Sequence, residues 1–444
     1  FKKWGLYANV VGKVIQKKEV IISHKSEIVA KIPTSALSDD TPLNIHNVMT
    51  DPPEYLLSKW KWTENNLPKI NKYQIFSLKE NDYFSISQII LKLLSNPSIA
   101  SKRWIYSQYD SQVQLNTVFK PGESDASLIR LRGQNQTSKE KFFSGIAASV
   151  DCNSRWVSLD PYRGSIAAVA ESARNVSCVG AEPLAITNNL NFSSPETDIG
   201  FWQLSTACDG ISQACKSFGT PVTGGNVSLY NESKDRNNTI TPINPTPVIG
   251  MVGKIDDVNK AVKSGWQDFD DEIWLVGSYS SESTIAASSY LEYFHGEITG
   301  RPPMIDLQTE KYCQSFLRTG ILKNFIISSH DISDGGLAIA LSECCVLSSK
   351  GATIELESEN NRLDNLLFSE GGSRILFSVN KKEKLNFLNF LKDYKNDLPN
   401  EVYVKKIGSV SEKYLKINIQ NKKICNILVD ELAHKFNNSI SSFF

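Results

Sequence analysis

A strand–helix–strand unit in the middle of the chain constrains the fold more than any other feature. Residues 184–187 predict one strand, and TGGNVS at 223–228 predicts a second. The helix between them is predicted to start with Pro195 and to end at Gly219. Folds that alternate strands with helices bind ligands at neighbouring strand ends. Asn188, at the end of the first strand, and the TGGNVS strand are therefore the first candidates for a binding site.

The TGGNVS strand carries residues typical of a phosphate and magnesium site. Gly224 and Gly225 have no Cβ, so a ligand can approach the backbone closely there. Asn226 offers an amide oxygen, which is a hard ligand suited to Mg²⁺. Ser228 projects to the same side as Asn226 because it lies two residues on in an extended chain. The alternative is that the glycines form only a bulge or turn, and that Asn226 holds the bend through a backbone hydrogen bond.

Strands and helices alternate along most of the chain, which predicts an α/β (α+β) fold with mixed sheets and packed helices. A chain of 444 residues is too long for one ordinary domain. We predict one full domain at 103–262 and a second at 266–444. Residues 38–102 are predicted to be a connector with one helix, because Pro and Asp break the regular pattern before the helical spacing of 84–94.

The first 37 residues repeat the pattern of the end of the chain. Residues 9–14 and 19–22 predict short strands, and the same layout returns after residue 405. The matched pairs, each 396 apart in residue number, are Gly12 with Gly408, Val14 with Val410, and Ile28 with Ile424. A repeat on this scale indicates a duplicated domain. We expect residues 1–37 to be the tail of an earlier copy of the last domain, in a protein whose first half is mostly missing here. Chance similarity between two hairpins is the alternative.

Composition argues against several classes of protein. Lys and Arg together number 48, as do Asp and Glu, so no nucleic-acid surface is indicated. The longest apolar runs, such as 89–91, are far too short to span a membrane. The eight cysteines form no C-x-x-C pair, and no histidine stands near them at metal-site spacing. They are typical of buried, reduced thiols, so we expect a cytoplasmic protein; a cysteine nucleophile is the alternative.

A second polar cluster, HDISDGG, precedes a predicted helix in the last domain. The N-terminus of a helix favours anions, which makes His330, Asp331 and Asp334 candidates for a functional role. The structural alternatives are a hydrogen-bonded histidine at a domain contact and helix N-capping by the two Asp residues. Glu370 and Arg374 are expected to form a structural pair or to bind a neighbouring loop rather than to act in catalysis.

Four long motifs give a specific resemblance. They are LDPYRGSIAAVAESARNVSCVGAEPLAITNNLNFSSPE, FWQLSTACDGISQACKSFGTPVTGGNVSLYNES, HDISDGGLAIALSE and the connector SKRWIYSQYDSQV. Together they are similar to the large, synthetase subunit of phosphoribosylformylglycinamidine synthase. The resemblance implies two aminoimidazole-ribonucleotide-synthetase-like halves, each with an N-terminal and a C-terminal α/β domain. That arrangement agrees with the internal repeat, and this chain resembles the end of the first half, the connector and the entire second half.

The resemblance also implies a reaction and its participants. Formylglycinamide ribonucleotide, glutamine, ATP and water would give formylglycinamidine ribonucleotide, glutamate, ADP and phosphate. ATP would activate the amide oxygen as a phosphate ester, and ammonia from a partner glutaminase subunit would displace the phosphate. Mg²⁺ would neutralise the charge on the phosphates. A small accessory subunit is expected as a further partner.

Four residues match binding positions of the family. Gly225 matches a nucleotide contact, Asn226 a magnesium ligand and Ser228 a substrate contact. Asn188 stands at the position of a nucleotide-contacting Asp, so the negative charge of that Asp is absent here. The resemblance therefore implies a neutral nucleotide contact at this position.

No catalytic acid or base is assigned in this chain. The family's catalytic histidines lie in the first half, and neither His24 nor His330 matches them. Two other functions stay open: a structural half that holds a nucleotide without turnover, and a related ATP-dependent synthetase of the same fold, such as aminoimidazole ribonucleotide synthetase. The repeat at residues 1–37 argues against the second, because a single-copy enzyme has no use for another terminal hairpin.

Overall fold

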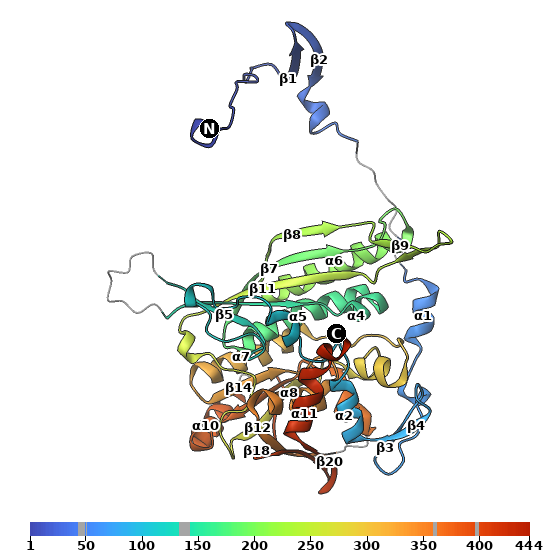
Figure 1. Cartoon of the computed structure of the whole chain (residues 1–444), viewed down its shortest axis with the longest axis vertical. Coiled ribbons are helices and arrows are strands. Elements are labelled where there is room, and N and C mark those ends of the chain that lie inside the picture. The colour runs from blue at the N-terminus through green and yellow to red at the C-terminus, as the bar shows by residue number, and fades with distance from the viewer. Residues whose placement is uncertain (43–48, 50, 133–142, 358–361, 396–398) are drawn as a thin grey trace. The chain divides into compact units, whose positions relative to one another are not determined.

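The computed structural model describes residues 1–42, 49, 51–132, 143–357, 362–395 and 399–444. The chain divides into two compact units, Phe1–Val48 and Met49–Phe444 (Figure 1). The larger unit holds mixed sheets with packed helices, which confirms the predicted fold class. Among the described residues, none of the helices combines the length and the apolar composition needed to cross a bilayer.

The first unit is built around a hairpin of β1 (Glu19–His24) and β2 (Glu27–Pro33). Short 3₁₀ turns flank it at Lys2–Trp4 and Thr34–Leu37. The predicted strand at 9–14 is wrong, because this segment pairs with no strand in the described part of the chain. A strand needs a neighbour that takes up its backbone hydrogen bonds.

The hairpin near the C-terminus has the same register as β1–β2. It consists of β19 (Tyr414–Ile419) and β20 (Lys422–Leu428), which pair antiparallel. In both hairpins the register shifts after the fourth residue pair. In both, the two turn residues have positive φ angles, and these are Lys25 and Ser26 in the first and Gln420 and Asn421 in the second.

This structural match revises the offset between the two copies. Ser23 pairs with Ile28, and Asn418 pairs with Lys423, so corresponding hairpin positions differ by 395 rather than 396. Ile28 therefore corresponds to Lys423, and its predicted match with Ile424 is wrong by one residue. The error is physical as well as numerical, because a slip of one residue moves a side chain to the other face of a strand. That residues 1–37 are the tail of an earlier domain copy stays a prediction.

The two hairpins differ in what covers their apolar faces. Leu415 and Ile417 of β19 are fully buried. Their counterparts Val20 and Ile22 are 37% and 47% exposed. The difference arises because β19 belongs to a seven-stranded sheet, whereas β1 and β2 form a sheet of only two strands within their own unit. The first hairpin thus presents, uncovered, the face that its counterpart buries.

The five-stranded sheet carries the candidate site. Its strands, in spatial order, are β5 (Ser127–Arg130), β6 (Gly145–Asp151), β11 (Thr246–Ile255), β7 (Glu182–Asn191) and β8 (Val222–Ser228). β7 and β8 pair in parallel because α6 (Asp198–Phe218) carries the chain back between them, while the other pairings are antiparallel. β8 is an edge strand (Figure 1). A separate hairpin of β9 (Glu232–Lys234) and β10 (Ile240–Pro242) follows it.

Helices cover one face of this sheet and leave the other open. α4 (Ser154–Leu159), α5 (Pro161–Cys178) and α6 contribute to one core cluster with the fully buried Ile186, Ile249 and Met251 of the sheet. Residues that alternate with these along the strands are partly or fully exposed, and the exposed ones include four apolar side chains: Ile129, Ile146, Val150 and Val252. An exposed apolar sheet face is typical of an interaction surface.

Helix capping explains where α5 and α6 begin. The carboxylate of Asp160 accepts a hydrogen bond from the N–H of Arg163 at the start of α5. The hydroxyl of Thr197 caps α6 by accepting from the N–H of Gly200 at 3.1 Å, so the prediction that Pro195 is the first helical residue is wrong. The predicted end at Gly219 is confirmed, since this residue has φ 72°, a conformation that glycine adopts readily.

A seven-stranded sheet forms the other half of the larger unit. Its spatial order is β14 (Ile326–Asp331), β17 (Ile375–Val379), β12 (Glu272–Ser278), β18 (Val402–Ser411), β15 (Gly351–Leu356), β19 and β20. Its helices are α7 (Leu307–Leu322), α8 (Gly336–Ser348), α9 (Leu363–Phe368), α10 (Lys384–Lys395) and α11 (Val429–Asn438). β13 (Ser283–Thr284) and β16 (Glu370–Gly371) form a short separate pair.

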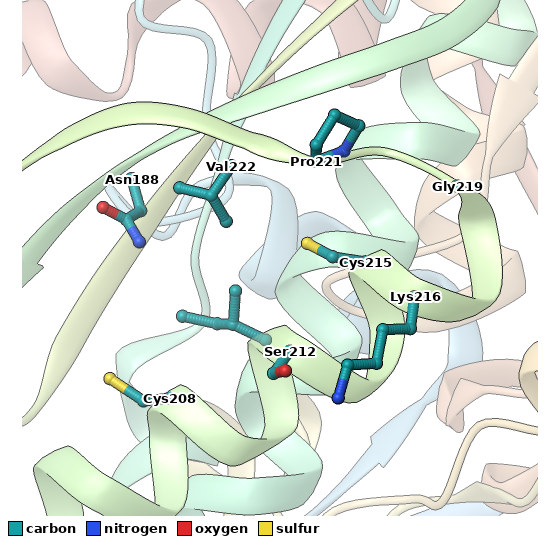
Figure 2. Close-up of a pocket in the computed structure, with 9 residues that line it drawn as sticks. Asn188, Cys208, Ser212, Cys215, Lys216, Gly219, Pro221 and Val222 are labelled. Atoms are coloured by element: carbon teal, nitrogen blue, oxygen red, sulfur yellow. The ribbon is translucent and has the colours of Figure 1, made fainter.

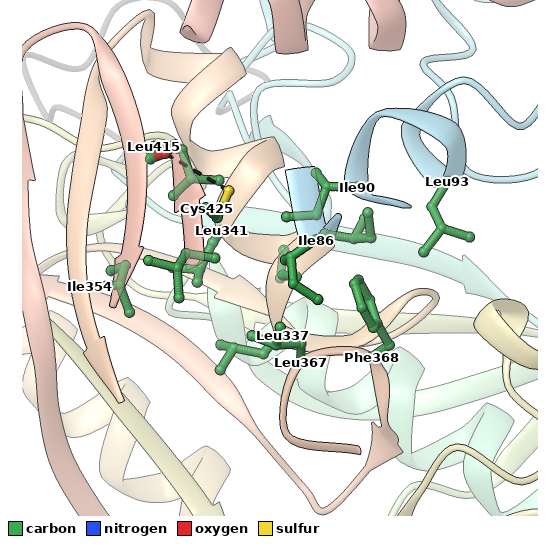
Figure 3. Close-up of a cluster of buried hydrophobic side chains, with 14 of the residues drawn as sticks. Ile86, Ile90, Leu93, Leu337, Leu341, Ile354, Leu367, Phe368, Leu415 and Cys425 are labelled. Carbon is green, nitrogen blue, oxygen red and sulfur yellow. Dashed lines mark hydrogen bonds between the residues drawn. The ribbon is translucent and has the colours of Figure 1, made fainter. Parts of the chain in front are cut away.

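The segment predicted as a connector is largely part of this core. It contains α1 (Glu54–Trp60), α2 (Ile86–Leu94) and a hairpin of β3 (Gln74–Ser77) and β4 (Asp82–Ser85), so the prediction of one helix is wrong. Pro53 leads into α1 instead of ending regular structure, because proline is tolerated at a helix start. Figure 3 shows Ile86 and Ile90 of α2 in one buried cluster with Leu341 of α8. Next along the chain comes the short α3 (Arg103–Tyr106).

Candidate functional site

The four predicted site residues lie on β7 and β8. The paired positions are Asn188 with Gly225, Asn189 with Asn226 and Asn191 with Ser228. The sequence predicted that the strand ends at Asn188, but β7 continues to Asn191, because β11 pairs with it as far as that residue. The parallel register nevertheless brings the amide residues of β7 beside the TGGNVS residues of β8.

Gly225 is a glycine because Asn188 occupies the space beside it. A Cβ at position 225 would collide with Oδ1 of Asn188 and would lie 2.8 Å from its carbonyl oxygen. A Cβ on Gly224 would meet nothing within 4 Å. Packing therefore requires the second glycine only, and Gly224 leaves open space beside the exposed backbone of an edge strand.

The alternation of side chains divides the predicted residues between the two faces of the sheet. Asn188 lies two residues after the buried Ile186, on the same face of the strand, and therefore faces the helices; Gly225 lies beside it. Asn226 and Ser228 face the open side. The sequence placed Asn226 and Ser228 on one side correctly, but it did not predict that Asn188 lies on the other.

On the helix side, Asn188 lines a cavity of about 550 Å³ between the edge of the sheet and α6. Figure 2 shows the cavity walls, with Pro221 and Val222 from the strand side and Cys208, Ser212, Cys215 and Lys216 from the helix. In the described part of the chain, Lys216 makes no hydrogen bond and no ion pair. The volume suits a small ligand, and the walls are mainly apolar with a few polar groups at their edges.

On the open side, the amide oxygen of Asn226 has no hydrogen-bond partner among the described residues. Its Nδ2 donates to Oδ1 of Asn189 at 3.2 Å, and the side chain is exposed. Ser228 donates to Oδ1 of Asn231 at 3.2 Å. No group of three or more His, Cys, Asp or Glu side chains suited to a metal ion occurs among the described residues. The chain can thus offer Mg²⁺ one neutral oxygen here, which fits an ion that is otherwise held by water and phosphate oxygens.

His330 is a hydrogen-bonded histidine at a domain contact, as the structural alternative for it states. Its Nδ1 lies 2.6 Å from Oδ1 of Asp125, just before β5, and its Nε2 lies 3.1 Å from Oε2 of Glu343 on α8. Burial disfavours the charged imidazolium, but the two carboxylates outweigh this and hold the pKa of His330 well above its usual value. The charged ring therefore links the domain of the seven-stranded sheet, which contains His330, to the domain of the five-stranded sheet, which contains Asp125.

Asp331 and Asp334 do not cap α8, so helix N-capping is the wrong alternative for them. The N-cap of α8 is Gly335, without a side-chain hydrogen bond. Oδ1 of Asp331 lies 2.6 Å from the guanidinium of Arg174, and Oδ1 of Asp334 lies 3.4 Å from that of Arg155. Both carboxylates therefore connect the C-terminal sheet to helices of the five-stranded sheet.

Glu370 and Arg374 do not form a pair, but both hold the loop that follows α9. Oε1 of Glu370 accepts from the backbone N–H groups of Ser289 and Gly335, each at 2.8 Å. Arg374 donates to the carbonyl oxygens of Gly371 and Ser369. The prediction of loop binding rather than catalysis fits these contacts.

Sequence reasoning missed the arginines that join the two sheets' domains. Arg174 on α5 pairs with Glu310 at 2.9 Å and with Asp331. Arg155 on α4 pairs with Glu292 at 2.7 Å. For Arg174 the available signal was a charged residue among the predominantly small and apolar residues of α5, since an arginine among buried positions requires a carboxylate partner.

Two family models match the larger unit. Residues 124–255 match the N-terminal domain of AIR synthase related proteins, and residues 270–414 match their C-terminal domain. A phosphoribosylformylglycinamidine synthase subunit PurL of Prochlorococcus marinus (strain MIT 9312) is 74% identical over 444 residues, which is all of this chain. The chain belongs to the PurL family. It spans 57% of the length of that PurL relative.

Solved PurL structures share the fold at lower identity. A T. maritima PurL complexed with FGAR has a TM-score of 0.57 and 15% identity, and the match covers 78% of this chain and 53% of that one. A T. maritima PurL complexed with AMPPCP has a TM-score of 0.54 and 17% identity over 78% of this chain and 50% of that one. These PurL structures support the architecture described above.

Proposed function

We propose that the chain provides part of a phosphoribosylformylglycinamidine synthase, which acts in purine biosynthesis in the cytoplasm. The reaction is the ATP-dependent amidation of formylglycinamide ribonucleotide with ammonia derived from glutamine. The observation that carries this proposal is the 74% identity to a PurL subunit over the whole chain. A glutaminase subunit and a small accessory subunit are the proposed partners.

The proposed site surrounds the edge strand β8. Asn188 and Gly225 would contact the nucleotide, since Asn188 lines the 550 Å³ cavity beside them. Ser228 would contact the ribonucleotide substrate and Asn226 would hold Mg²⁺, both on the open face. A phosphate chain can cross from one face to the other at Gly224, where no side chain stands in its way. When bound, Mg²⁺ neutralises the negative charge on the phosphate oxygens.

The rest of the protein is proposed to complete this site. The open face that carries Asn226 also carries exposed apolar side chains, and burial of such a face stabilises a domain contact. No catalytic acid or base is assigned in this chain, so these groups would come from the part of the protein that covers the open face. Closure of that face would also exclude water from Asn226 and Ser228, which strengthens their polar contacts with a ligand.

A second candidate is a half that holds a nucleotide without turning it over. The specific observation in its favour is the neutral side chain of Asn188, at the position that the resemblance matches to a nucleotide-contacting Asp. Exchange of bound nucleotide separates the two functions: a site that takes part in the reaction exchanges labelled ATP on the time scale of turnover, whereas a structural site retains its nucleotide.

The test of the proposed function uses the full-length protein and the 444-residue chain in parallel. With glutaminase, glutamine and Mg²⁺, the full-length protein is expected to form ADP that depends on formylglycinamide ribonucleotide. The chain alone, with ammonium in place of glutamine, is expected to form none, since positioned acid–base groups contribute about 10²–10⁴-fold. Absence of substrate-dependent ADP from the full-length protein would reject the function, and turnover by the chain alone would reject the division of labour.

A further inference from the structure

A cavity of about 420 Å³ lies between α7 and the five-stranded sheet, apart from the proposed site. Its walls come from α7, from Phe218 at the end of α6 and from Glu182 at the start of β7. Glu182 lies six residues before Asn188 on the same strand, which corresponds to about 20 Å in an extended chain. The cavity therefore differs in position from the one beside Asn188.

The cavity wall on α7 is a polar stripe. Lys311, Ser315 and Arg318 recur at intervals of four and three, as one helix face requires, and Tyr312 lies next to Lys311. All four are partly buried rather than exposed. The opposite face of α7 packs into the core through Cys313, Phe316 and Leu317. The helix thus points its charged face at a hollow instead of at open solvent.

Arg318 is a partly buried guanidinium without a carboxylate partner among the described residues. It makes one hydrogen bond, from Nη1 to Oγ of Ser177 at 2.8 Å, out of five available donors. By contrast, Arg155 and Arg174 pair with carboxylates within 2.7 and 2.6 Å. Burial lowers the pKa of Arg318, although Glu182 and Tyr394 oppose the change. A cation in this setting is stabilised by any oxyanion that reaches it.

Lys311 supplies a second cation on the same helix face. Its Nζ donates to the carbonyl oxygen of Ser217 at 2.7 Å, and its other two N–H groups have no acceptor among the described residues. It lies seven residues before Arg318, or about 10 Å along the helix axis. Glu182 carries a negative charge on another wall, so a bound anion is expected on the α7 side of the cavity.

We propose that this cavity binds a small metabolite through a phosphate or carboxylate oxyanion, with Arg318 as the forked donor and Lys311 as the second cation. The planar guanidinium matches the geometry of both oxyanions, and the volume lies in the range of small-ligand sites. Because the walls come from both sheets' domains, a bound anion connects α7 to the strand–helix–strand unit that carries the proposed nucleotide site.

Isothermal titration of the 444-residue chain at low salt tests this proposal, with inorganic phosphate and glutarate as probes. Saturable binding of at least one probe is expected, and the tighter one identifies the oxyanion class. Arg318→Gln is expected to weaken binding about tenfold or more, because it removes a charge-assisted donor pair. Arg236→Gln, the same change at an exposed arginine between β9 and β10, is expected to leave the affinity unchanged.

Circular dichroism of each variant shows whether it folds. Arg318→Lys keeps the charge but loses the planar fork, so it is expected to remain folded and still to weaken binding. The proposal is overturned if neither probe binds saturably to the unchanged chain. It is also overturned if binding survives in folded Arg318→Gln or Arg318→Lys with the original affinity, because the anion would then bind elsewhere.

Discussion

Substitution of Gly225 by alanine tests the packing of the candidate site, and Gly224→Ala is its matched control. Both glycines lie on the exposed edge strand β8, and neither has a positive φ. A Cβ at position 225 would collide with the side chain of Asn188 and would lie 2.8 Å from its carbonyl oxygen, whereas one at 224 would meet nothing within 4 Å. The two substitutions therefore differ only in the contact with β7.

The expected cost of Gly225→Ala follows from which atoms can move. Rotation of Asn188 about its side-chain bonds relieves the clash with Oδ1 but not the contact with the carbonyl oxygen, which the strand pairing holds. Overpacking of this kind costs about 1–3 kcal/mol. The gain of about 0.4–1 kcal/mol from a less flexible unfolded chain is common to both variants and cancels in their comparison.

Hydrogen exchange of the β8 amides is the suitable assay, because an edge strand can relieve strain by detaching without global unfolding. Gly225→Ala is expected to speed exchange by roughly 5- to 150-fold, the equivalent of 1–3 kcal/mol, and Gly224→Ala by less than about threefold. Equal rates in the two variants would refute the reasoning, since they would show that Asn188 does not determine the residue at 225.

Three further predictions concern the metal contact, the repeat and pH. In the full-length enzyme, Asn226→Ala is expected to raise the Mg²⁺ requirement with little loss of melting temperature, because the exposed hydrogen bond between Asn226 and Asn189 contributes at most about 1 kcal/mol. A lower melting temperature with unchanged Mg²⁺ dependence would show that Asn226 is not a metal ligand. Ile417→Lys is expected to unfold the 444-residue chain, as judged by circular dichroism. Ile22→Lys, the matching change on the exposed hairpin, is expected to shift the melting temperature by no more than about 2 °C. Equal losses of melting temperature in the two variants would show that the first hairpin is buried. Burial raises the pKa of Glu370 to about 7, so the folded protein retains a proton that the unfolded chain releases above about pH 4.3. The contribution of Glu370 to the free energy of unfolding therefore falls as the pH rises from about 4.3 to about 7. Glu370→Gln is expected to flatten that fall in urea denaturation between pH 5 and 8, and an unchanged slope would contradict it.

The sequence was a good guide to local structure and a poor one to what each element meets. Helical spacing and Gly219 predicted α6 and its end, because these signals lie within the helix itself. The partner of Arg174 could not be predicted, since Asp331 is distant in the chain and only the packing of the two sheets' domains brings them together. The prediction of a strand at 9–14 was wrong for the same reason: the pattern suits a strand, but no strand among the described residues pairs with this segment.

The chemistry of the open face follows from the neutrality of its polar groups. Asn226 and Ser228 offer amide and hydroxyl groups, and Asn188 offers another neutral amide on the other face of the same strand pair. Neutral groups do not repel the phosphates of a nucleotide, but one amide oxygen binds Mg²⁺ weakly on its own. If Asn226 holds Mg²⁺ as proposed, the metal is expected to arrive together with the nucleotide, whose phosphate oxygens supply negative charge for it. Carboxylates from the part of the protein that covers this face would then strengthen the binding of Mg²⁺.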